Sequence, residues 1–134
     1  MNSELRAALA PVLRDLDGPD GVRVRVEESD WAADIPLRSA GAMLWDTDGS
    51  GMGVRVELRR PRAVQVAFVA DQVQEFAVEA LWRLGRPTNW PRCPRHPATH
   101  PAAAEERGGE AYWVCPVSRE TIGVIGGLGA PGGG

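Results

Sequence analysis

Residues 63–85 read "AVQVAFVADQVQEFAVEALWRLG" and change their apolar period part-way along. At the start Val64, Val66 and Phe68 alternate with other residues, which is typical of a half-buried strand. From Asp71 onward the apolar residues recur at intervals of three and four, which predicts a helix with one buried face. The change of period therefore predicts a strand that leads directly into a helix.

The residues before this stretch supply the other elements of the predicted fold. Apolar spacing in residues 3–16 predicts a helix, and "VRVRVE" at 22–27 alternates strictly, as a half-buried strand does. Two further strands are predicted at 42–45 and 53–59, before the one at 63–69. The order indicates an α+β protein: an antiparallel meander of three to four strands with helices on one face.

The chain of 134 residues divides by composition into three regions. Residues 1–85 form the predicted α+β core. Residues 86–125 form a predicted appendage that contains a polar loop, "AAAEERGGE", and a C-terminal β-hairpin made of "AYWVC" and "TIGVIG". Residues 126–134 are rich in glycine and are predicted to be a flexible tail.

The proline-rich segment "NWPRCPRHPATHP" carries three residues that commonly bind metals. Cys93, His96 and His100 lie in it, and Cys115 completes the pattern Cys-x2-His-x3-His-x14-Cys. These four are all the cysteines and histidines of the chain. Two thiolates and two imidazoles match the tetrahedral Cys2His2 set of structural zinc. A metal-free loop and a disulfide between the cysteines are the alternatives, although a reducing compartment disfavours the disulfide.

Two short motifs in this region resemble the knuckles of zinc ribbons. The first, "CPRH", is similar to a CPxC knuckle with His96 as its second ligand, and "WVCP" is similar to the second knuckle. The second knuckle departs from the family because Ser118 stands where a cysteine or histidine is expected. The resemblance implies a ribbon-like or rubredoxin-like zinc hairpin. The same residues also resemble small proteins of high-GC bacteria that end in "WPxCPxHPxxHP…WVCP".

A catalytic zinc is the alternative to a structural one. Catalytic sites keep an open position for water, whereas the four candidate ligands here would close the shell. The motif HExxH is absent. A zinc-dependent hydrolase would need one ligand to be missing, with Glu105 or Glu106 as the base, so a structural zinc is favoured.

The segment "DTDGSGMGVRVE" fits the ligand template of a calcium-binding EF-hand loop. Asp46, Asp48 and Ser50 occupy its first, third and fifth positions, and Glu57 occupies the twelfth. An EF-hand loop joins two helices, but here an alternating strand follows. Gly53 also stands where an apolar residue is normal. The segment is therefore interpreted as a hairpin turn.

An interaction surface is predicted beside the candidate metal site. Trp90 with Arg86, Arg92 and Arg95 would suit a protein partner or stacked nucleic-acid bases. The net charge of −3 argues against general binding to nucleic acid. The sequence thus favours a non-enzymatic zinc-binding accessory protein with a protein partner, and a nucleic-acid-binding accessory protein is the alternative.

The chain lacks the features of a membrane or exported protein. It has no run of about 18 apolar residues, so no membrane-spanning helix is expected. Its first residues have no basic segment of the kind that begins a signal peptide. A cytoplasmic location is the expectation.

Overall fold

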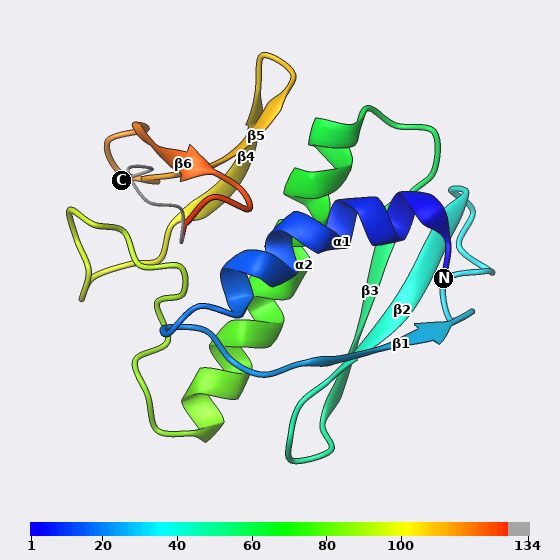
Figure 1. Cartoon of the computed structure of the whole chain (residues 1–134), viewed down its shortest axis with the longest axis horizontal. Helices are drawn as coiled ribbons and strands as arrows, with labels where there is room; N and C mark the ends of the chain where they lie inside the picture. The colour runs from blue at the N-terminus through cyan, green and yellow to red at the C-terminus, as the bar shows by residue number, and fades with distance from the viewer. Residues whose placement is uncertain (129–134) are drawn as a thin grey trace.

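Two helices and two three-stranded antiparallel sheets form the computed structural model, which describes residues 1–128 (Figure 1). The elements in chain order are α1 (Ser3–Leu16), β1 (Arg25–Ser29), β2 (Ser39–Trp45), β3 (Gly51–Glu57), α2 (Arg62–Arg83), β4 (Ala103–Arg107), β5 (Glu110–Val114) and β6 (Thr121–Val124). The α+β class is confirmed. Residues 129–134, most of the predicted flexible tail, lie outside the described part of the chain.

Helix α1 forms where the apolar spacing predicts it. Its cap is Asn2, whose side-chain oxygen accepts hydrogen bonds from the backbone amides of Glu4 and Leu5 at 2.9 and 3.1 Å. Such a cap satisfies amides that have no partner within the helix. The apolar face of α1 is fully buried against α2 and the first sheet.

The first sheet is the predicted meander, with strand order β1-β2-β3. Ala42 pairs with Val54, and Leu44 pairs with Met52. Ala42, Leu44 and Val54 are fully buried and pack in one core with the helices. Both helices therefore cover the same face of this sheet, as predicted. The first strand begins at Arg25, three residues later than its alternation suggested.

Residues 63–69 do not form the predicted fourth strand, because helix α2 already begins at Arg62. Pro61 stands immediately before it. Val66, Val69 and Val73 are buried and lie on the same face of the helix as the buried residues of its later turns. Over a stretch as short as 63–69, the alternation of apolar residues fits either the two-residue period of a strand or the 3.6-residue period of a helix. Burial of a continuous helical face decides between them, since tertiary packing overrides the strand propensity of valine.

The free edge of strand β3 is covered by a side chain of α2. The side-chain oxygen of Gln72 accepts from the backbone amide of Arg55 at 3.0 Å, and its nitrogen donates to the Arg55 carbonyl at 2.8 Å. Further along, the buried side chain of Gln65 donates to the Glu57 carbonyl. These amide groups occupy the backbone positions to which another strand would bind.

The outer face of the first sheet carries Trp31, which lies on two glycines. The Trp31 ring nitrogen donates to the carbonyls of Ala42 and Val54 at 3.0 and 3.2 Å. A Cβ atom on Gly41 would lie 2.7 Å from the ring, and one on Gly53 would lie 2.8 Å from it. The ring can lie this close only because both positions lack a side chain.

Replacing Gly53 by alanine is expected to lower the free energy of unfolding by about 1–3 kcal/mol, because the new methyl group displaces the Trp31 ring. Chemical denaturation of the variant measures this loss. In a Trp31→Ala background the same substitution should cost almost nothing, since the clashing atoms are gone. An equal cost in both backgrounds would contradict the proposed contact.

The second sheet has the order β4-β5-β6 and differs from the predicted appendage. The predicted polar loop at 102–110 contains strand β4, which pairs with β5 through a two-residue turn. Gly108 and Gly109 form that turn with φ values of +59° and +87°. Two adjacent glycines with positive φ suit a tight hairpin. A three-stranded sheet thus replaces the predicted C-terminal zinc-ribbon hairpin, of which only the pairing of β5 with β6 is present.

Trp113 joins the second sheet to the helices. Its side chain is fully buried, and the ring of Trp90 packs edge-on against it at 5.5 Å between centroids. The Trp113 ring nitrogen donates to the buried carboxylate of Asp15, which also accepts from the backbone amides of Gly126 and Leu128. The second sheet and both helices therefore share one core.

The side chain of Gln74 on α2 holds the segment that leads to β4. Its amide nitrogen donates to the carbonyls of Trp90 and Ala102. Both ends of the loop between them are thus fixed on the helix. Within residues 1–128 neither helix has the length and apolarity required to span a membrane.

Candidate metal centre

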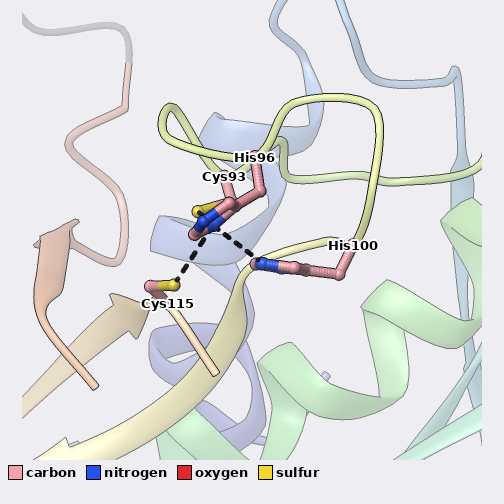
Figure 2. Close-up of side chains that lie close together, drawn as sticks. All are labelled: Cys93, His96, His100 and Cys115. Atoms are coloured by element: carbon pink, nitrogen blue, oxygen red, sulfur yellow. Dashed lines mark hydrogen bonds between the residues drawn. The ribbon is translucent and has the colours of Figure 1, made fainter. Parts of the chain in front are cut away.

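The first part of the candidate centre is the loop between Pro91 and Ala102. The Ala102 amide donates to the Pro91 carbonyl at 2.7 Å, which closes the base of the loop. Within it the His96 amide donates to the Cys93 carbonyl at 3.1 Å. A second turn follows, and it brings His100 back toward the same point. Two consecutive turns in a proline-rich segment thus place three donor side chains on one side of the loop (Figure 2).

The second part is the turn that follows strand β5. Cys115 directly follows this strand, and the amide of Arg119 donates to the Cys115 carbonyl at 2.9 Å. Arg119 has a φ of +68°, which closes the turn tightly. The Ser118 amide donates to the Cys115 sulfur at 3.4 Å. Ser118, which lacks a ligand atom for the expected position, therefore supports the thiolate through its backbone.

The four side chains converge on a single point (Figure 2). The Nδ1 atom of His96 lies 3.7 Å from the Cys93 sulfur, 3.8 Å from the Cys115 sulfur and 3.1 Å from Nε2 of His100. All four donor atoms lie within 4.8 Å of one another. The set forms a possible metal-binding site, made from two segments that meet only in the folded chain.

The surroundings of the cluster favour the metal-binding forms of its side chains. Both cysteines are buried and free, and no disulfide joins them in this structure. Hydrogen bonds from the hydroxyl and the amide of Ser118 outweigh burial and lower the pKa of the Cys115 thiol to about 6. A thiol with a lowered pKa is more readily the thiolate that binds metal.

The ring of His100 is held by the backbone next to it. Its Nδ1 atom lies 3.0 Å from the Pro101 carbonyl. Because a carbonyl oxygen only accepts, this contact places the proton on Nδ1 and leaves the Nε2 lone pair directed at the cluster. Metal-binding histidines commonly use a backbone carbonyl in this way.

The carboxylates proposed for an open catalytic site are engaged elsewhere. Glu105 pairs with Arg107 and with Arg119, and Glu106 accepts from the amide of Gly109 in the β4–β5 turn. Neither belongs to the cluster of donor atoms found among residues 1–128. Both carboxylates thus make their contacts in the β4–β5 hairpin and in the turn after β5.

The segment at 46–57 contains the hairpin turn that the sequence favoured over a calcium loop. Strands β2 and β3 flank this turn, in which the carboxylate of Asp46 accepts from the side chain of Arg83 at 2.8 Å. Asp48 accepts from the Ser50 amide, so its oxygen caps the turn. Arg83 thus supplies the positive charge beside these acids.

Glu57, the last ligand of the template, lies at the far end of β3 and pairs with arginines there. Gly53, which the template does not expect at its position, is explained by the Trp31 ring that lies on it.

The interaction surface predicted around Trp90 lacks its exposed aromatic ring. Trp90 is 2% exposed and packs against Trp113. The Arg86 side chain donates to the carbonyls of Gly21 and Pro19, in the connection between α1 and β1. The ring is buried because its apolar area completes the core between α2 and the second sheet. This prediction is therefore wrong in its central residue.

The two remaining arginines of that surface pair with acids. Arg92 lies 3.8 Å from the Asp20 carboxylate, and Arg95 pairs with Glu120. The charges of these arginines are thus partly neutralised, and the Trp90 ring that was expected to stack beside them lies in the core.

Three residues that position the site have no distinctive sequence pattern. Ser118 acts through its hydroxyl and its backbone amide, Gln74 through a side chain on α2, and Pro101 through its carbonyl. A backbone donor or acceptor is available at almost every position, so residue type does not reveal it.

Comparison of the chain with protein families, with curated proteins and with solved structures finds no match.

Proposed function

We propose that the protein binds one structural zinc ion through Cys93, His96, His100 and Cys115, and that it acts as a non-enzymatic accessory or protein-interaction module. The separations of the donor atoms are the observation that carries this proposal. Their chemical type, burial and supporting hydrogen bonds agree with it.

The three separations measured from Nδ1 of His96 are close to those of a zinc-sized tetrahedron, and the four donors together lie within 4.8 Å of one another. Zinc lies about 2.3 Å from sulfur and about 2.0–2.1 Å from nitrogen in proteins. At tetrahedral angles these bond lengths separate a sulfur from a nitrogen by about 3.6 Å and two nitrogens by about 3.3 Å. The corresponding distances here are 3.7 and 3.8 Å for sulfur to nitrogen and 3.1 Å for nitrogen to nitrogen.

The donor types select zinc over the commoner hard cations. Thiolates and imidazoles are poor ligands for magnesium and calcium, which prefer oxygen. The contact of the Cys115 sulfur with the Ser118 amide also supports the resemblance to a zinc-ribbon knuckle, with His100 as the ligand that the second knuckle lacks.

Four protein donors support a structural role. A catalytic zinc needs a free position for water, and no fifth side chain with a base stands in this cluster among residues 1–128. The zinc would fix the 92–101 loop to the end of β5. Two buried cysteines without a disulfide between them also suit a cytoplasmic location.

Metal analysis of the purified protein tests the proposal. We expect about one zinc per chain, and we expect Cys93→Ser and His100→Ala to lose it, because three remaining ligands bind zinc much more weakly. Thr99→Ala is the matched control. It changes an exposed residue of the same loop whose side chain is not a donor in the cluster.

A full zinc equivalent in Cys93→Ser would exclude this assignment of ligands. A zinc content that His100→Ala leaves unchanged would instead indicate three protein ligands and an open position, which is the arrangement of the hydrolase alternative.

A further inference from the structure

Helix α2 exposes a straight stripe of side chains opposite its buried face. The stripe consists of six residues: Val64, Phe68, Asp71, Glu75, Val78 and Trp82. They are spaced four, three, four, three and four residues apart, which is the spacing of a helix–helix seam. At 3.6 residues per turn, all six lie on the side of the helix away from its core residues.

The two ends of the stripe are apolar and unusually exposed. Trp82 is 74% exposed, Val64 is 40% exposed and Phe68 is 36% exposed. A hollow of about 330 Å³ is lined by Pro61, Val64 and Phe68 at one end. Another, of about 430 Å³, is lined by Val78, Trp82 and Thr88 at the other end. An exposed tryptophan beside a hollow is typical of an anchor in protein interfaces.

The centre of the stripe is acidic. Asp71 and Glu75 are both exposed, and neither forms an ion pair with any other residue between 1 and 128. Glu79 lies beside them and is also exposed without such a pair. The surface therefore combines two apolar ends with a negative centre over a length of about 27 Å.

This charge pattern excludes a second copy of the chain as the natural occupant. Two copies of the stripe packed in parallel would oppose Asp71 to Asp71. Packed antiparallel, they would oppose Asp71 to Glu75. Either arrangement gathers four carboxylates at the centre, and like charges opposed across an interface destabilise it.

We infer that this stripe is the docking surface for an amphipathic helix of another protein, with apolar side chains at both ends and lysine or arginine at the centre. Its apolar residues enter the two hollows, and its cations face Asp71 and Glu75. The inference gives the partner class for the interaction role proposed above. It does not rest on zinc, because none of its residues belongs to the metal cluster.

Two helical peptides of about three heptads provide the test. Both carry leucine at the four outer seam positions, and they differ only in having arginine or glutamate at the two central positions. Fluorescence anisotropy with the full chain should show binding of the arginine peptide, at least about tenfold tighter than the glutamate peptide. Trp82→Ala should lower the affinity for the arginine peptide by about tenfold or more.

Charge reversal sharpens the test. Glu75→Arg should reverse the preference between the two peptides, whereas Leu37→Ala, which removes an exposed leucine elsewhere, should change nothing. Zinc content and circular dichroism of each preparation separate a loss of docking from a loss of metal or fold. No binding at about 1 mM peptide, equal binding of both peptides, or dimers that Trp82→Ala dissociates would overturn the inference.

Discussion

Replacing Cys93 by serine is expected to lower the free energy of unfolding by about 4 kcal/mol when zinc is present at a thousand times its dissociation constant. The reason is linkage: the folded chain assembles the four donors at one point, and the unfolded chain does not. Denaturant titration of the zinc-loaded protein, the chelated protein and the variant measures the effect. The chelated wild type should unfold near the variant.

The loss of order should be local. Hydrogen exchange should accelerate in residues 92–101 and 115–120, which carry the ligands. The base of the loop should keep its protection because Gln74 still binds the carbonyls of Trp90 and Ala102. Strands β1–β3 should keep their structure, and their amides should lose only the protection that corresponds to the fall in the global free energy of unfolding. If chelation left the unfolding midpoint unchanged, the metal would have no part in stability.

Asp15→Ala is expected to lower the free energy of unfolding by about 3 kcal/mol, because each buried donor left without an acceptor destabilises the fold by about 1–3 kcal/mol. Asp15 accepts from the Trp113 ring at 2.8 Å, from the Gly126 amide at 2.6 Å and from the Leu128 amide at 3.1 Å. The Trp113 ring is fully buried and cannot turn to water. Urea denaturation monitored by tryptophan fluorescence gives the loss directly.

Asp17→Ala is the matched control for this experiment. Asp17 lies two residues further along the chain but is exposed. Its replacement should change the free energy of unfolding by no more than about 0.5 kcal/mol. Asp15→Asn retains one oxygen and should give an intermediate loss. Equal stabilities of Asp15→Ala and Asp17→Ala would show that the buried carboxylate is not needed to hold the second sheet.

Helices and strands that bury one face, and whose apolar residues recur with one clear period, were predictable from the sequence. Helix α1, strand β3 and the later turns of α2 are of this kind. The first two turns of α2 were not, because alternation over seven residues satisfies the strand and helix patterns alike. Strand β4 was predicted as a loop because its residues are alanine and glutamate, although Gly108 and Gly109 marked the hairpin turn.

The candidate metal site shows the same division between local and long-range information. Residue type and spacing were enough to select the four donors, because cysteine and histidine are scarce in the chain. The contact between Asp15 and Trp113 joins residues 98 positions apart, and no local sequence pattern predicts it. Burial of Trp90 was missed for the same reason, since it depends on the Trp113 ring from another strand.

Gln72 has a consequence for how this protein behaves at high concentration. Strand β3 is the last of its sheet, and an uncovered last strand recruits strands from other molecules into growing aggregates. By occupying the Arg55 amide and carbonyl, Gln72 blocks the addition of a strand at this edge of the sheet, whose other edge is β1. The helix that supports the core therefore also protects this edge from pairing with a strand of another molecule.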